Sequence, residues 1–69
     1  MKVKLTALKD FEAINTWGEE TSIHEGDAYE GTRTSLNGGG QLVTIDINNV
    51  PTIFWEKTVK EFFKIEEVE

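Results

Sequence analysis

The acidic side chains form the clearest chemical pattern in this sequence. Residues 16–31 contain no lysine or arginine but five carboxylates, those of Glu19, Glu20, Glu25, Asp27 and Glu30. Trp17 stands two residues before the first of them. An exposed tryptophan beside acids favours docking of a basic protein, because the ring supplies contact area and the acids steer the approach. The alternative is that Trp17 folds back over the core and the acids only solvate a loop.

A second group of aromatic residues lies in the last third of the sequence: Phe54, Trp55, Phe62 and Phe63. Side chains alternate between the two faces of a strand, so Phe54 must face opposite to Ile53 and Trp55. One face should therefore show an aromatic patch that includes Trp55, unless a helical turn or the last strand covers it.

Residue types that support catalysis or metal binding are scarce. His24 is the only histidine, and cysteine is absent. Ser22 lies too close to His24 in the sequence to form a catalytic triad, so His24 should be exposed to solvent. The glycines at residues 38–40 lack the rest of a phosphate-binding loop, and the carboxylates lack the spacing of a calcium loop. We therefore expect no enzyme, no cofactor and no metal site.

Length and composition predict a single domain over residues 1–69. Only 38% of the 69 residues are hydrophobic, which is enough for one small core. The absence of cysteine fits a reducing, cytoplasmic location. A net charge of −6 argues against direct binding to nucleic acid. No apolar run approaches 18 residues, so no membrane segment is expected.

Period-two alternation predicts the strands that must position these residues. The inward positions of a first strand are Val3, Leu5 and Ala7. Residues 41–48 show the best-defined strand, with inward side chains Val43, Ile45 and Ile47. The glycines at residues 38–40 should form the hairpin connection to a strand over residues 28–34.

The C-terminal part of the chain is predicted to contain two more strands and a helical turn. Residues 48–51 indicate a turn, because asparagines favour turn geometry and proline cannot donate to a central ladder. A strand over residues 52–57 follows. The capping-box spacing of Thr58 and Glu61 could open a longer helix, but the periodicity favours one turn near residues 58–62 and a last strand over residues 63–67. Five short strands in so small a chain predict an all-β barrel.

Two segments resemble the SH3 domain family. Ala7-Leu8-Lys9-Asp10-Phe11 is similar to the motif that follows the first strand of that family, and residues 20–27 are similar to the segment that ends its RT loop. The resemblance implies an SH3-like five-stranded barrel in which residues 14–19 form the RT-type loop. Ile23 would plug the barrel, and Gly26 would take a tight bend.

The sequence departs from the SH3 pattern at the positions that bind proline-rich peptides. Lys9 replaces the first aromatic residue of the motif, while Phe11 retains the second. Residues 40–42 contain no tryptophan, and Phe62 is not preceded by the expected proline. We therefore expect an SH3-like shape without polyproline binding.

These patterns lead to a hypothesis for function. The chain is expected to be a non-enzymatic protein–protein interaction module, a monomer or weak dimer, whose acidic RT-type loop binds a basic partner. Its candidate contact residues are Phe11, Trp17, Glu19, Glu20, Asp27 and Trp55. One alternative is an acidic inhibitor that mimics nucleic acid and blocks a basic site on a host enzyme, as in phage-encoded accessory proteins. The other is an enzyme fragment or structural subunit that oligomerisation completes.

Overall fold

The structure is a computed structural model that describes residues 1–68. These residues form seven strands and one helix, with the bounds β1 (Lys2–Ala7), β2 (Phe11–Ile14), β3 (Glu20–Ile23), β4 (Ala28–Ser35), β5 (Gln41–Ile47), β6 (Val50–Trp55), α1 (Glu56–Phe62) and β7 (Phe63–Glu67). The all-β class with one short helix is confirmed. The number of strands is seven and not the predicted five, because β2 and β3 were not predicted as strands.

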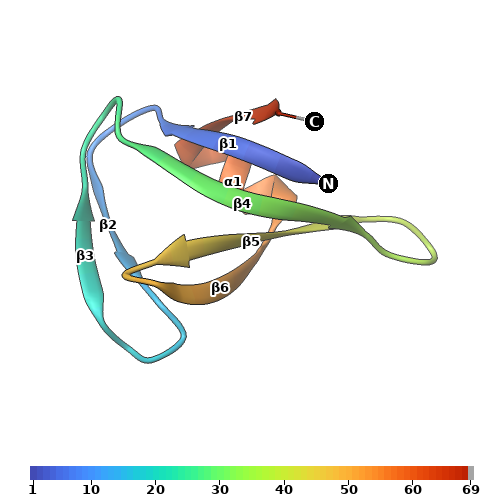
Figure 1. Ribbon diagram of the computed structural model, residues 1–69, viewed down its shortest axis with the longest axis horizontal. Helices are drawn as coiled ribbons and strands as arrows, with labels where there is room; N and C mark the ends of the chain where they lie inside the picture. Colours follow the sequence, from blue (N-terminus) through green and yellow to red (C-terminus); the bar gives the residue numbers. More distant parts are fainter. Residues whose placement is uncertain (69) are drawn as a thin grey trace.

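Five strands form one antiparallel sheet in the order β6-β5-β4-β1-β7, and β2 pairs with β3 in a separate hairpin (Figure 1). The sheet is not closed into the barrel that the sequence suggested, because within residues 1–68 no ladder joins β6 to β7. The physical reason is the helix: α1 begins directly after β6 and ends directly before β7, so it occupies the interval between the two sheet edges. A helix of seven residues spans about 10 Å, twice the spacing of paired strands.

Arg33 on β4 ties this arrangement together at one end. Its Nη1 lies 3.2 Å from Oε2 of Glu56 on α1, and its Nη2 donates to Glu67 on β7. The two carboxylates thereby link the helix and the last strand to the middle of the sheet.

The core lies between the sheet, the hairpin and the helix. The period-two alternation correctly identified its inner rows, since Val3, Leu5 and Ala7 of β1 and Val43, Ile45 and Ile47 of β5 are all buried. Ile23 of the hairpin is buried against them, as predicted, together with Val59 and Phe63. Gly26 has the expected positive φ of 90° at the bend after β3.

Two boundaries differ from the sequence prediction. The turn after β5 needs only Asn48 and Asn49, both at positive φ, so β6 begins at Val50 and contains Pro51. Proline is tolerated there because β6 is an edge strand. The helix starts at Glu56 after Trp55, which gives no side-chain cap, so the capping-box residues lie inside it and do not open it. The last strand has the predicted bounds, Phe63–Glu67.

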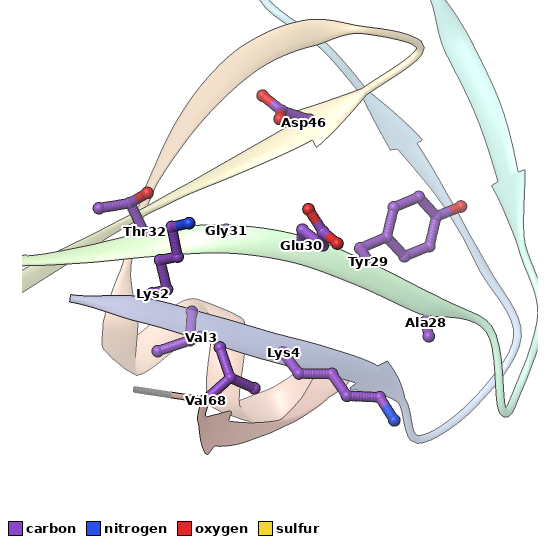
Figure 2. Close-up of a pocket in the computed structure, with 10 residues that line it drawn as sticks. All are labelled: Lys2, Val3, Lys4, Ala28, Tyr29, Glu30, Gly31, Thr32, Asp46 and Val68. Atoms are coloured by element: carbon purple, nitrogen blue, oxygen red, sulfur yellow. The ribbon is translucent and has the colours of Figure 1, made fainter.

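Gly31 allows β4 to curve across the middle of the sheet. A Cβ atom at this position would lie 2.5 Å from the carbonyl oxygen of Thr44 and 2.9 Å from Cδ1 of Leu5. Figure 2 shows Gly31 in β4 between β1 and β5. The close approach of three strands at Gly31 thus requires glycine, as at the bends of strongly curved sheets.

We predict that Gly31→Ala destabilises the fold by about 1–3 kcal/mol, because the added methyl group would overlap backbone that cannot move freely. Urea unfolding followed by tryptophan fluorescence measures the change. Thr32→Ala at the neighbouring exposed position is the control and should have a smaller effect. Equal stability of Gly31→Ala and the natural chain would contradict the role of Gly31.

Candidate partner-binding site

Asn15 organises the loop that connects β2 to β3, hereafter the tip loop (residues 15–19). The side chain is buried, and its Oδ1 accepts hydrogen bonds from the backbone N–H groups of Trp17 and Glu19, both at 3.0 Å. Its Nδ2 donates to Oε1 of Glu19 at 2.8 Å and to the carbonyl oxygen of Ile47 at 3.2 Å. One amide thus fixes the conformation of the loop and attaches it to the end of β5.

Further contacts hold the tip loop against β6. The backbone N–H of Thr16 donates to Oγ1 of Thr52 at 3.2 Å, and Oγ1 of Thr16 donates to the carbonyl oxygen of Pro51 at 3.1 Å. Nδ2 of Asn48 donates to Oγ1 of Thr21 at 2.6 Å. The tip of the hairpin is therefore held by the turn between β5 and β6.

The base of the hairpin is held separately by β1. The backbone N–H of Ala7 donates to the carbonyl oxygen of Asp27 at 2.8 Å. The backbone N–H of Gly26 donates to the carbonyl oxygen of Ala7, also at 2.8 Å. The N–H of Glu25 donates to Oδ1 of Asp10 at 2.8 Å. The hairpin is thus fixed at both ends, although its strands do not join the five-stranded sheet.

Trp17 projects from this fixed loop into solvent, with 76% of its surface exposed. The interpretation of Trp17 as a lid over the core is therefore wrong, because a lid residue would be buried. Glu19 and Glu20 are exposed beside it. A large ring presented on a rigid loop beside two carboxylates offers a binding surface that loses little conformational entropy when a partner binds.

A cleft of about 320 Å³ separates β2 from the helix and the inner face of β5 and β6. All four residues of β2 line it, and the opposite wall is mostly apolar, formed by Ile45, Ile47, Phe54, Thr58, Val59, Phe62 and Phe63. At one end the ring of Phe11 lies 4.7 Å from that of Phe62 and 5.4 Å from that of Phe63. Nζ of Lys9 lies 4.7 Å from the centre of the Phe62 ring, a cation–π contact.

The six candidate contact residues do not form one site. Trp17, Glu19 and Glu20 lie together at the tip loop. Phe11 lies partly buried at the opposite end of β2, and Asp27 lies at the base of the hairpin, where its Oδ2 accepts the N–H of His24 at 2.9 Å.

Trp55 lies elsewhere, at the end of β6 near the turn that contains Gly40. It is 57% exposed and shares the outer face of β6 with Ile53, which is 63% exposed. The exposed face of β6 therefore presents one aromatic ring and one aliphatic side chain, on a surface separate from the tip loop.

Sequence reasoning missed two features of the site. The first is Asn15, which could have been recognised from an asparagine three residues before Gly18, a spacing typical of a side-chain-capped turn. The second is the cleft, which the exposed Ile14 helps to line. It was not recognisable from local sequence patterns, because its walls come from five separate elements.

Other parts of the surface offer less chemistry. The hollow in Figure 2, beside the bend of β4, is lined by Lys2 and Lys4 together with Glu30 and Asp46, so its charges are mixed. Burial raises the pKa of nearby Tyr29, and the negative charge of Asp27 adds to the effect, so the hydroxyl stays protonated.

Three features bear on the expectations of an exposed histidine, no metal site and no membrane segment: His24, the acidic side chains and the helix. His24 is exposed, as predicted, with its Nδ1 3.7 Å from Oδ2 of Asp27. Among residues 1–68, no three acidic or histidine side chains gather closely enough to hold a metal ion. The single described helix is too short to cross a membrane.

Comparisons of the chain with protein-family models, curated proteins and solved structures give no match.

We predict that Asn15→Ala lowers the free energy of unfolding by about 3 kcal/mol, because it leaves buried polar groups of the loop and of Ile47 without partners. Trp17→Ala should change it by no more than about 0.5 kcal/mol, since the ring is solvated in the free protein. Urea unfolding of both variants checks this. Strong destabilisation by Trp17→Ala would show that its ring covers the core after all.

Proposed function

We propose that this chain is a non-enzymatic protein-interaction module that binds a basic partner through the tip loop of the β2–β3 hairpin. The observation that carries the proposal is the exposure of Trp17 on a loop that the buried Asn15 holds rigid. Interface anchors are enriched in tryptophan, and a preorganised loop avoids much of the entropy cost of binding.

The distribution of charge supports a basic partner. Residues 10–32 contain seven acids and no lysine or arginine. Most of these acids lie on the hairpin and the turns at its two ends. Their combined field would accelerate the approach of a positively charged surface.

We further propose that the fold is SH3-like in its order of elements, with the sheet left open between β6 and β7. Support comes from the hairpin at the position of the RT loop and from a short helix before the last strand. Polyproline binding is not part of the proposal. The aromatic rings of Phe11 and Phe62 pack against each other at a tilt of 41°, and Lys9 covers part of the Phe62 ring, which leaves little aromatic surface for a polyproline helix.

The proposal is tested by capture with three baits: the natural chain, Trp17→Ala, and the double variant Glu19→Gln/Glu20→Gln. A captured protein is then purified for binding kinetics. Trp17→Ala should weaken binding by about 2 kcal/mol or more through faster dissociation. The double variant should slow association, and rising salt should do the same.

Glu61→Gln/Glu66→Gln is the matched control, since it changes the net charge equally at exposed sites away from the hairpin. Its binding should resemble that of the natural chain. If both double variants weaken binding equally and Trp17→Ala binds normally, the acids act by overall charge alone. That result would refute the tip loop as the site and favour a nucleic-acid mimic.

Proline-rich peptides should bind no more tightly than about 1 mM, because the aromatic ridges that hold a polyproline helix are incomplete. Titration of a small panel of PxxP peptides, followed by NMR shifts, measures this. Micromolar binding with shifts at Phe11 and Trp17 would contradict the prediction.

A further inference from the structure

The outer edge of β2 carries backbone groups that point away from β3. The backbone N–H of Asn15 donates to the carbonyl oxygen of Glu19 at 3.1 Å, in register with the β2–β3 ladder. Bonded and non-bonded pairs alternate along an antiparallel ladder, so every second residue counted back from Asn15 bonds to β3. The N–H and C=O groups of Glu12 and Ile14 therefore face the other way.

These groups border the apolar cleft. All four residues of β2 line the cleft, and β3 contributes none. Figure 1 shows β2 on the side of the hairpin that faces β5 and β6. Because the hairpin is held at its tip by Asn15 and at its base by Gly26, β2 cannot move across the cleft to pair with the sheet.

The two faces of the hairpin define which strand would fit this edge. On an added strand, alternate side chains would point into the cleft, towards the half-buried ring of Phe54. The remaining side chains would lie on the outer face of the hairpin, next to Glu12 and Ile14, with Glu20 one strand further away on β3. The first set should therefore be apolar and the second set basic.

We propose that the edge of β2 binds an extended segment of a partner protein by strand addition, with apolar side chains in the cleft and lysine or arginine beside Glu12. Main-chain hydrogen bonds to Glu12 and Ile14 supply affinity, and the alternation of side chains supplies specificity. The basic character of the ligand rests on the proposed function, whereas the pairing rests on the edge itself.

The probe is the capped peptide Lys-Val-Lys-Val-Lys-Val-Lys, titrated into the natural chain and followed by NMR. We expect a Kd of about 0.1–1 mM. At saturation, hydrogen exchange at the amides of Glu12 and Ile14 should slow at least ~10-fold, because these amides become hydrogen-bonded.

Backbone N-methylation of the peptide tests the pairing without altering the protein. One peptide carries N-methyl groups on its lysines and another on its valines. A strand uses the amides of only one edge, so only one of the two peptides should lose binding, by about tenfold or more. Loss with methylated lysines would indicate antiparallel addition, and loss with methylated valines would indicate parallel addition.

Ile14→Pro tests the same edge from the protein side. Proline removes the N–H of residue 14, and edge strands tolerate proline where that group faces away from the ladder. The variant should bind the probe about tenfold more weakly than Ile14→Ala, which loses the same side chain but keeps the N–H. If Ile14→Pro does not fold, the methylated peptides decide the question.

Strand addition is overturned if the probe does not bind by about 5 mM, if both methylated peptides bind equally, or if the amides of Glu12 and Ile14 stay unprotected. In the last two cases, binding that still depends on Trp17 and on salt leaves the proposed function intact.

Equal binding of a Glu-Val-Glu-Val-Glu-Val-Glu peptide would instead refute the preference for a basic partner. Protection that rises with protein concentration, without peptide, would identify a second copy as the occupant and overturn the proposal.

Discussion

The buried amide of Asn15 is the constraint on which the position of the hairpin depends. Within residues 1–68 the hairpin shares no ladder with the five-stranded sheet, so side-chain contacts must place its tip. The Asn15 amide both closes the loop and bonds the carbonyl oxygen of Ile47. The conformation of the loop that carries Trp17 follows from this attachment, because a buried polar group in so small a core must keep its partners.

The helix determines why a cleft remains beside β2. It crosses between the two edges of the sheet, and Arg33 links it to β4 through Glu56. A helix cannot donate to a strand edge, so neither β2 nor β6 gains a partner from it. Proteins usually protect free edges with charges or proline, as Pro51 does on β6. On β2 the free edge carries the exposed Ile14 as well as Glu12, which suits an edge that binds an apolar and basic segment.

The strands were predictable because their information is local. The alternation at Val43, Ile45 and Ile47 needs only a period of two and one buried face, and a shift of one residue would expose all three. Closure into a barrel was not predictable in the same way. It depends on whether the chain after Trp55 continues as strand or turns into helix, and the local pattern there was ambiguous between one helical turn and a longer helix.

The sequence by itself determined the all-β class, the inner rows of the sheet, the acidic character of the hairpin and the scarcity of catalytic residues. Only the tertiary structure decided that Trp17 is exposed, that Trp55 lies on a different surface, and that a cleft opens beside β2. Alternation reports which side of a strand faces inward, but the exposure of a loop residue depends on contacts with distant elements. For Trp17 those contacts are made by its neighbour Asn15 with Ile47, 32 positions along the chain.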